Sequence, residues 1–142
     1  NTQPKRPDMP TVLIADDDAQ LSDLIRRYAE HCGWRALVAT NGEELVATFD
    51  ALDEPVLLLV DVAMPKLDGV DAVEFLTRAP NAHRARLRMM TGGHFTHALA
   101  ATMIANAMSI PAGICIYKPF TMDELGSVLH EEARLLESTH AA

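Results

Sequence analysis

The sequence of 142 residues lacks the features that mark secreted and membrane-spanning proteins. It has only two cysteines, Cys32 and Cys115, whose spacing fits neither a metal-binding motif nor a disulfide framework, so we expect a reducing, cytoplasmic environment. No apolar run approaches the roughly 20 residues that a membrane-spanning helix needs, and the N-terminus has no signal-peptide core. These absences lead us to expect no membrane insertion.

The chain also has few basic residues compared with acidic ones. The chain has 12 Lys and Arg residues against 20 Asp and Glu residues, which gives a formal net charge of −8. Nucleic acids and anionic membrane surfaces would repel such a protein, so we expect no direct nucleic-acid binding. The sequence also lacks a glycine-rich phosphate loop and a nucleophile elbow, which argues against nucleotide binding and against serine or cysteine hydrolases.

What is present is a steady alternation of short apolar runs with longer amphipathic segments. We expect strands at 12–15, 34–39, 56–60, 87–90 and 113–117, and helices at 21–32, 41–52, 70–79, 95–109 and 121–137. This alternation predicts an α/β fold, with a five-stranded parallel sheet doubly wound by helices on both faces. The length suits one domain, which we place at residues 11–138, after a flexible leader or linker at 1–10 and before a tail at 139–142.

Polar residues stand where the expected strands end. Asp16 and Asp17 follow the first strand, Asp61 the third, Thr91 the fourth and Lys118 the fifth. Because binding sites of open α/β sheets lie outside the carboxyl ends of the strands, we expect these side chains to converge. Clustered carboxylates repel one another unless a cation joins them, and their oxygens suit Mg²⁺ or Mn²⁺. A metal-bound aspartate beside a lysine and a hydroxyl is what phosphoryl transfer onto a carboxylate requires.

Four motifs, taken together, resemble the receiver domain of two-component response regulators. They are VLIADDD, LLLVDVAMPKLDG, MMTGG and YKPF, in that order. Their intervals also agree with the family, because Asp61 lies 44 positions after Asp17 and Thr91 lies 30 positions after Asp61. The resemblance covers Val12 to about Leu136 and implies the flavodoxin-like receiver fold.

The resemblance implies a role for each residue of the site. Asp61 would be the phospho-acceptor, Asp17 would bind Mg²⁺ directly and Asp16 through water. Asp61 and the backbone carbonyl of Ala63 would complete the protein's share of the metal ligands. Thr91 and Lys118 would contact the phosphoryl group and act with Asp61 in its transfer. The bond from Lys118 to Pro119 is expected to be cis, which proline makes accessible.

The function implied by the resemblance is that of a phosphoryl-accepting signalling switch in a phosphorelay. A histidine kinase or a histidine phosphotransfer protein would donate to Asp61. Output would pass through contacts of the fourth helix, fifth strand and fifth helix with a downstream effector protein, and the same face could form a dimer. We expect no enzyme in the ordinary sense, with at most self-phosphorylation and self-dephosphorylation.

Two departures from the family pattern concern the expected signalling face. Receivers usually carry Tyr or Phe three positions before the lysine, at the switch position, where this chain has Cys115; Tyr117 lies nearby but directly before Lys118. The interval from Thr91 to Lys118 is 27 positions, longer than usual, and the excess falls around residues 106–111. Both departures affect the expected signalling face and leave the chemistry at the acceptor untouched.

Two other functions are weighed against the switch. The first is a receiver-like scaffold that acts without phosphorylation, which Cys115 and the longer connection favour. The second is a Mg²⁺-dependent phosphatase with an aspartyl nucleophile. Such enzymes carry a second aspartate two positions after the nucleophile, and Ala63 stands there.

Several other polar residues have simpler expected roles. Asp18 directly precedes an amphipathic helix, as an N-cap does. Asp68 forms a turn pair with Gly69. Glu131 and Glu132 are expected on a solvated helix face.

Overall fold

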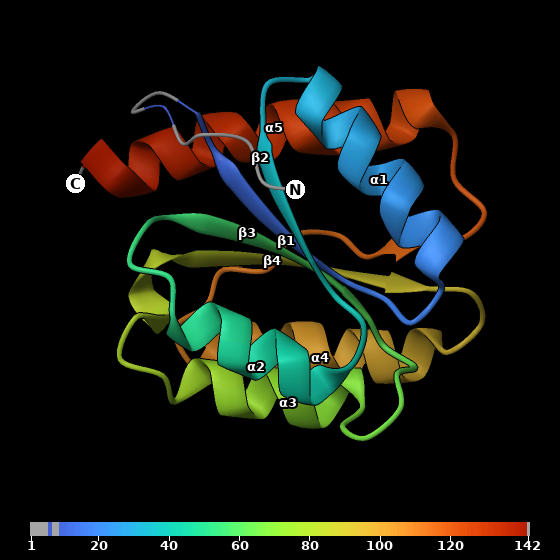
Figure 1. Cartoon of the computed structure of the whole chain (residues 1–142). Coiled ribbons are helices and arrows are strands. Elements are labelled where there is room, and N and C mark those ends of the chain that lie inside the picture. The colour runs from blue at the N-terminus through green and yellow to red at the C-terminus, as the bar shows by residue number, and fades with distance from the viewer. Residues whose placement is uncertain (1–5, 7–8, 142) are drawn as a thin grey trace.

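Five parallel strands form one sheet in the order β2-β1-β3-β4-β5, and helices cover both of its faces (Figure 1). The computed structural model describes residues 6 and 9–141. The strands are β1 (Thr11–Ala15), β2 (Arg35–Ala39), β3 (Val56–Asp61), β4 (Ala85–Thr91) and β5 (Ile116–Tyr117). The helices are α1 (Ala19–His31), α2 (Gly42–Asp50), α3 (Gly69–Thr77), the 3₁₀ helix η1 (Ala82–Arg84), α4 (Phe95–Ala107) and α5 (Met122–Ala141). The strand order is flavodoxin-like, and the predicted doubly wound α/β fold is confirmed.

Two hydrophobic cores lie on opposite faces of the sheet. Helices α1 and α5 cover one face and helices α2, α3 and α4 cover the other, as Figure 1 shows. Successive side chains of a strand point to opposite faces, so Val12 and Ile14 of β1 enter the α1/α5 core while Leu13 enters the α2/α3/α4 core. Because both faces of the sheet are buried, the sequences of the central strands are continuous apolar runs.

Aspartates at the helix starts fix where the loops end. The side chain of Asp18 accepts hydrogen bonds from the backbone N–H groups of Gln20 and Leu21, so its predicted N-cap role is confirmed. Asp68 caps α3 in the same way by accepting from Asp71. Both caps lie at the edge of the sheet where the strands end, and they hold the loops that carry the polar residues.

The ends of several elements differ from the prediction. Strand β5 comprises only Ile116–Tyr117 instead of 113–117, although an isolated bridge joins Leu87 to Ala112. Helix α5 continues to Ala141, past the expected end of the helix at 137. Most of the expected leader at 1–10 lies outside the described residues.

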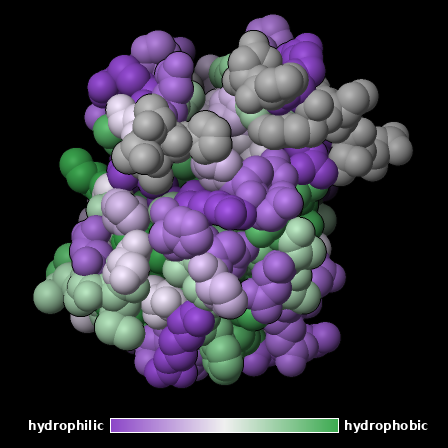
Figure 2. Space-filling model, turned by 90° about the vertical axis from the view of Figure 1, so that its left-hand side faces the viewer, coloured by the Kyte–Doolittle hydropathy of each residue, from purple (hydrophilic) through white to green (hydrophobic). Residues whose placement is uncertain are grey.

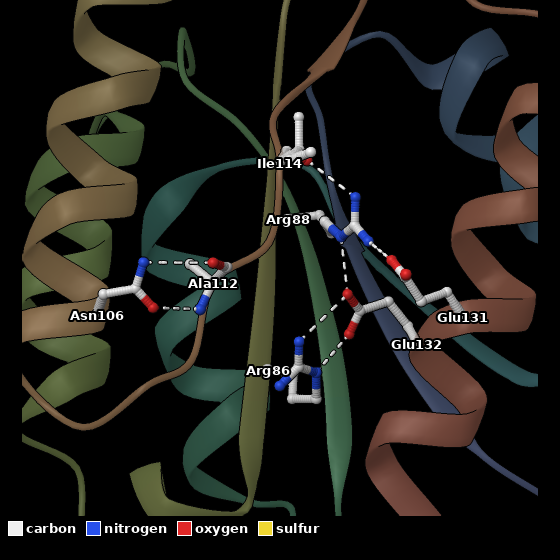
Figure 3. Close-up of polar contacts among 7 residues, drawn as sticks. All are labelled: Arg86, Arg88, Asn106, Ala112, Ile114, Glu131 and Glu132. Atoms are coloured by element: carbon white, nitrogen blue, oxygen red, sulfur yellow. Dashed lines mark hydrogen bonds and ion pairs between the residues drawn. The ribbon is translucent and has the colours of Figure 1, made fainter.

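Glu132 contradicts the expectation of a solvated helix face. Its side chain is fully buried, and it pairs with Arg86 at 2.6 Å and with Arg88 at 2.7 Å, while the half-exposed Glu131 also contacts Arg88 (Figure 3). The two arginines come from β4 positions whose partners on β3, Leu57 and Leu59, are apolar. We call these four residues the arginine–glutamate network. The sequence of α5 alone does not reveal it, since the partners lie more than 40 positions away.

The edge of the sheet at which the strands begin presents mostly polar residues with scattered apolar ones (Figure 2). None of the helices in the described part of the chain is long and apolar enough to cross a membrane.

Candidate functional site

Three carboxylates converge where β1 and β3 end. Asp16 and Asp17 follow β1, Asp61 is the last residue of β3, and these two strands pair directly, with Ala15 opposite Val60. One oxygen from each of the three carboxylates lies within 4.8 Å of the other two. Asp16 is fully buried and Asp61 nearly so, whereas Asp17 is exposed. The strand order reverses at β1, so the group occupies the position where open α/β sheets bind ligands.

Lys118 joins this group from the far edge of the sheet. Its Nζ lies 2.6 Å from Oδ2 of Asp16 and 3.5 Å from Oδ1 of Asp61. Its backbone N–H donates to the carbonyl of Thr91 at 2.8 Å, which places the residue directly after β5. The Lys118–Pro119 peptide bond is cis. We call Asp16, Asp17, Asp61 and Lys118 the acidic site.

The charges of the acidic site shift its pKa values. Burial raises the pKa of Asp61, the negative charge of Asp16 raises it further, and Lys118 only partly opposes them. Burial alone would lower the pKa of Lys118, but its hydrogen bond to Asp16 and the nearby charges of Asp16 and Asp61 outweigh this effect and raise that pKa. One ammonium therefore faces three carboxylates, and negative charge is left in excess.

This excess and the donor set fit a divalent cation. All the converging ligand atoms are carboxylate oxygens, the type that Mg²⁺ prefers, and the exposed Asp17 leaves the group open to solvent. Lys118, the lysine of the acidic site, already donates to Asp16. The geometry is thus suited to hold a hard cation and to present an Asp61 oxygen beside it.

Thr91 and Ala63 lie on either side of Asp61. Thr91 ends β4, one residue beyond the Met90 that pairs with Asp61, and its buried Oγ1 accepts hydrogen bonds from the N–H groups of Gly93 at 3.3 Å and His94 at 2.7 Å. The backbone N–H of Ala63 donates to the Asp61 carboxylate and works to lower the pKa of Asp61. The predicted metal-binding role of the Ala63 carbonyl stays a prediction.

Gly69 is a site residue whose sequence context predicts only a turn. A Cβ at this position would lie 2.7 Å from Cα of Val62 and 2.9 Å from the carbonyl oxygen of Asp61. Its N–H donates to the Val62 carbonyl at 2.9 Å. Only glycine lets the start of α3 close against the loop after β3, so Gly69 helps to fix the backbone that presents Asp61.

Cys115, at the predicted switch position, lies outside the acidic site. It is partly buried, packs against the α2/α3/α4 core and precedes β5. Burial raises the pKa of its thiol, which disfavours a reactive thiolate at neutral pH. Tyr117 is 57% exposed, so it is not a buried substitute for the usual aromatic residue.

Known proteins are related to parts of this chain in sequence. The transcriptional regulatory protein CpxR of Klebsiella pneumoniae is 36% identical over 83 residues, which are 58% of this chain and 34% of CpxR. The autoinducer 1 sensor kinase/phosphatase LuxN of Vibrio campbellii is 43% identical over 63 residues, which are 44% of this chain and 7% of LuxN. The chain therefore matches about a third of CpxR and a small part of LuxN.

A solved structure supports the fold. The receiver domain of sensor histidine kinase PA1611 from Pseudomonas aeruginosa PAO1 superposes with a TM-score of 0.74 at 20% identity, over 88% of this chain and 98% of that domain. That crystal structure holds a magnesium ion coordinated in its active site cleft. Residues 12–130 of this chain match the family model of the response regulator receiver domain. With this match over most of its length, and with the receiver fold built around an acidic site, the chain belongs to the response regulator receiver domain family.

Proposed function

We propose that this receiver domain is a phosphoryl-accepting switch in a two-component phosphorelay, with Asp61 as the phospho-acceptor. The observation that carries the proposal is the position of the Asp61 carboxylate, 3.5 Å from Lys118 and in one group with Asp16 and Asp17. A histidine kinase or a histidine phosphotransfer protein is the donor, and the reaction takes place in the cytoplasm.

Asp16, Asp17 and Asp61, with the Ala63 carbonyl, are the proposed Mg²⁺ ligands. The bound cation would neutralise charge on the phosphoryl oxygens. The excess of negative charge in the acidic site and the magnesium ion in the PA1611 receiver support this assignment. Nothing comparable supports Mn²⁺.

The chain's own residues supply the rest of the transfer. An oxygen of the Asp61 carboxylate attacks the phosphorus of a phosphohistidine; the new O–P bond forms as the N–P bond to the donor imidazole breaks. Asp16 raises the pKa of Lys118, so its ammonium stays charged and can pair with a phosphoryl oxygen. Thr91 Oγ1 only accepts in its two contacts with the loop, so its own proton is free to donate to a phosphoryl oxygen.

Output is proposed to pass through the face formed by α4, β5 and α5. Residues 89–117 contain no Asp, Glu, Lys or Arg, in a chain whose charged residues make up 23%. The large exposed apolar side chains of this segment are Phe95, Leu99, Met103, Met108, Ile114 and Tyr117. Exposed apolar patches of this kind mark interaction sites. The partner is a downstream effector protein, and a second copy of this chain could use the same face to form a dimer.

The product of the reaction stays on the protein, so the domain is a switch and not an enzyme with a diffusible product. Self-phosphorylation and self-dephosphorylation are the activities that it would retain. The second candidate function is that of a scaffold acting without phosphorylation. Cys115 favours it, because the aromatic residue usual at the switch position is absent.

Phosphorylation by a small donor tests the proposal directly. Incubation with acetyl phosphate and Mg²⁺ is expected to add one phosphoryl group, detected by intact-mass spectrometry, and Asp61→Asn is expected to abolish the addition. Asp68→Asn is the matched control, since it makes the same change at a helix N-cap where both residues serve well. An unmodified wild type, with the cognate kinase tried as well as small donors, would favour the scaffold.

A further inference from the structure

Strands β4 and β5 do not keep one register along their length. Leu87 bridges to Ala112, whereas Met90 pairs with Ile116. Three steps along β4 are therefore matched by four steps along the segment that leads into β5, so this segment contains one extra residue. Such a bulge is rare between parallel strands, and here it lies on an edge strand.

The extra residue decides which face the following residues occupy. Ala112 packs against the α2/α3/α4 core, whereas Ile116 belongs to the α1/α5 core. In an unbroken strand, residues four positions apart lie on the same face. The bulge therefore reverses which face of the sheet each later residue of β5 occupies. This reversal includes Lys118, whose N–H donates to the Thr91 carbonyl and whose Nζ reaches Asp16.

Arg88 holds the bulge from the side of β4. Its Nη1 donates to the carbonyl of Ile114 at 3.1 Å, as Figure 3 shows. Gly113 leaves room for it, because a Cβ there would lie 2.5 Å from Nε of Arg88. The bulge turns the Ile114 side chain outward, where it is 78% exposed. Asn106 of α4 holds the same segment from the other side, through two hydrogen bonds with the backbone of Ala112.

Helix α5 in turn holds Arg88. Nε of Arg88 donates to Glu132 at 2.7 Å, Nη2 contacts Glu131, and Arg86 occupies the other oxygen of Glu132. Arg88 is only 6% exposed, and an apolar side chain at this position would avoid the desolvation cost of a buried guanidinium. Outside the network, Arg88 also donates to the carbonyl of Ile114, a hydrogen bond that an apolar side chain could not make.

We propose that Arg88 is a positioning residue for phosphoryl transfer, which holds the β5 bulge and thereby directs Lys118 toward Asp16 and Asp61. This rests on the proposed function of Asp61 as phospho-acceptor. Arg88 touches none of the reacting groups. It acts through the backbone of residues 113–117, with α5 as its anchor.

The test compares Arg88→Met and Lys118→Met, singly and together, in phosphorylation by acetyl phosphate. Arg88→Met is expected to slow the reaction by about tenfold or more, since small misplacements of a charged group are costly. In the Lys118→Met background it should have no further effect, because the group that it positions is gone. The Kd for Mg²⁺ should change in the same direction in Arg88→Met as in Lys118→Met, since both variants take the ammonium away from Asp16 and Asp61. Arg78→Met, at an exposed arginine, is the matched control.

Two further variants address the risk that Arg88→Met disturbs the fold. Gly113→Ala keeps every charge but crowds Arg88, so phosphorylation is expected to slow in the same direction. Deletion of Ile114 in the Arg88→Met chain removes the extra residue. The segment can then form an unbroken strand in which each remaining residue keeps the face of the sheet that it occupies in the wild type. This repair is expected to restore the rate to within about threefold of wild type.

The outcomes separate this inference from the proposed function. Effects of Arg88→Met and Lys118→Met that multiply in the double variant, or no repair by the deletion, would overturn the positioning role. If wild type takes up no phosphoryl group, the proposed function fails. A crystal structure of Arg88→Met then still decides the positioning role, which is upheld if Lys118 Nζ has left Asp16 and overturned if the contact remains.

Discussion

Two groups of charged residues lie against this sheet, and their charges are arranged in opposite ways. The arginine–glutamate network sets two guanidinium groups against two carboxylates, so its formal charges cancel. The acidic site sets one ammonium against three carboxylates, and burial and Asp16 raise the pKa of Asp61. The network lies between the strands and α5, whereas the acidic site opens to solvent at the strand ends through Asp17.

The two groups differ in whether their own charges are balanced. Buried charges are tolerated when their partners satisfy them, and a balanced group of this kind serves structure. An unbalanced group is held in place by the rest of the fold and gains stability when a ligand supplies the missing charge. Charge balance therefore distinguishes a structural cluster from a binding site within one domain.

The largest expected effect comes from unbalancing the network. Glu132→Ala leaves Arg86 and Arg88 buried without their shared carboxylate, and we expect the free energy of unfolding to fall by about 3–5 kcal/mol. Urea denaturation measures this loss. Glu137→Ala, on an exposed part of the same helix, is the control. A loss below about 1 kcal/mol would mean that solvent or other groups satisfy the arginines.

Supplying the missing charge to the acidic site should have the opposite effect. Mg²⁺ at ten times its Kd is expected to raise the free energy of unfolding by about 1.4 kcal/mol, because only the folded chain brings the three carboxylates together. Asp17→Asn should weaken Mg²⁺ binding by about tenfold or more and abolish most of this stabilisation at the same concentration. Thermal unfolding with and without Mg²⁺ checks both. Equal Mg²⁺ affinity in the variant would contradict the assignment of Asp17 as a ligand.

Removing one carboxylate from the acidic site should also stabilise the protein when no divalent cation is present. Asp61→Asn removes a buried charge next to Asp16, and we expect a gain of about 1 kcal/mol at neutral pH. Because the pKa of Asp61 is raised in the fold, the folded chain binds its proton more tightly than the unfolded chain. The contribution of Asp61 to stability therefore falls as the pH rises from its unfolded-state pKa to its raised folded-state pKa.

It follows that the advantage of Asp61→Asn is greatest at neutral pH and disappears in acid, where wild-type Asp61 is protonated. Urea denaturation across pH in a chelating buffer measures it. A gain that grows as the pH falls would contradict the raised pKa.

The smallest effect is expected at an exposed ion pair. Arg78 lies 4.0 Å from Glu74, and both side chains are exposed. Arg78→Gln is expected to change the free energy of unfolding by less than about 0.5 kcal/mol, since exposed pairs contribute little. A larger loss in urea denaturation would show that burial is not what separates the network from ordinary surface charges.

Local patterns predicted much of this molecule. The apolar run before Asp61 and the aspartates after β1 predict buried strands with polar ends, and the parallel sheet brings those ends together. Asp18 predicts its own cap, because the residues that it contacts are two and three positions away. The run at 113–117 is also apolar, yet only its last two residues pair regularly with β4, because the segment carries an extra residue and its Ile114 carbonyl accepts from the Arg88 side chain instead.

The sequence by itself determined the α/β order, the two-sided core and the residues that meet at the strand ends, because these follow from periodicity and from parallel strands ending at one edge. Only the tertiary structure decided that Glu132 is buried and that the segment leading into β5 carries an extra residue. Each of these depends on contacts between residues far apart in the chain. From the sequence alone, a guanidinium or a carboxylate is predicted to be solvated, and only the fold shows the partner that makes its burial tolerable.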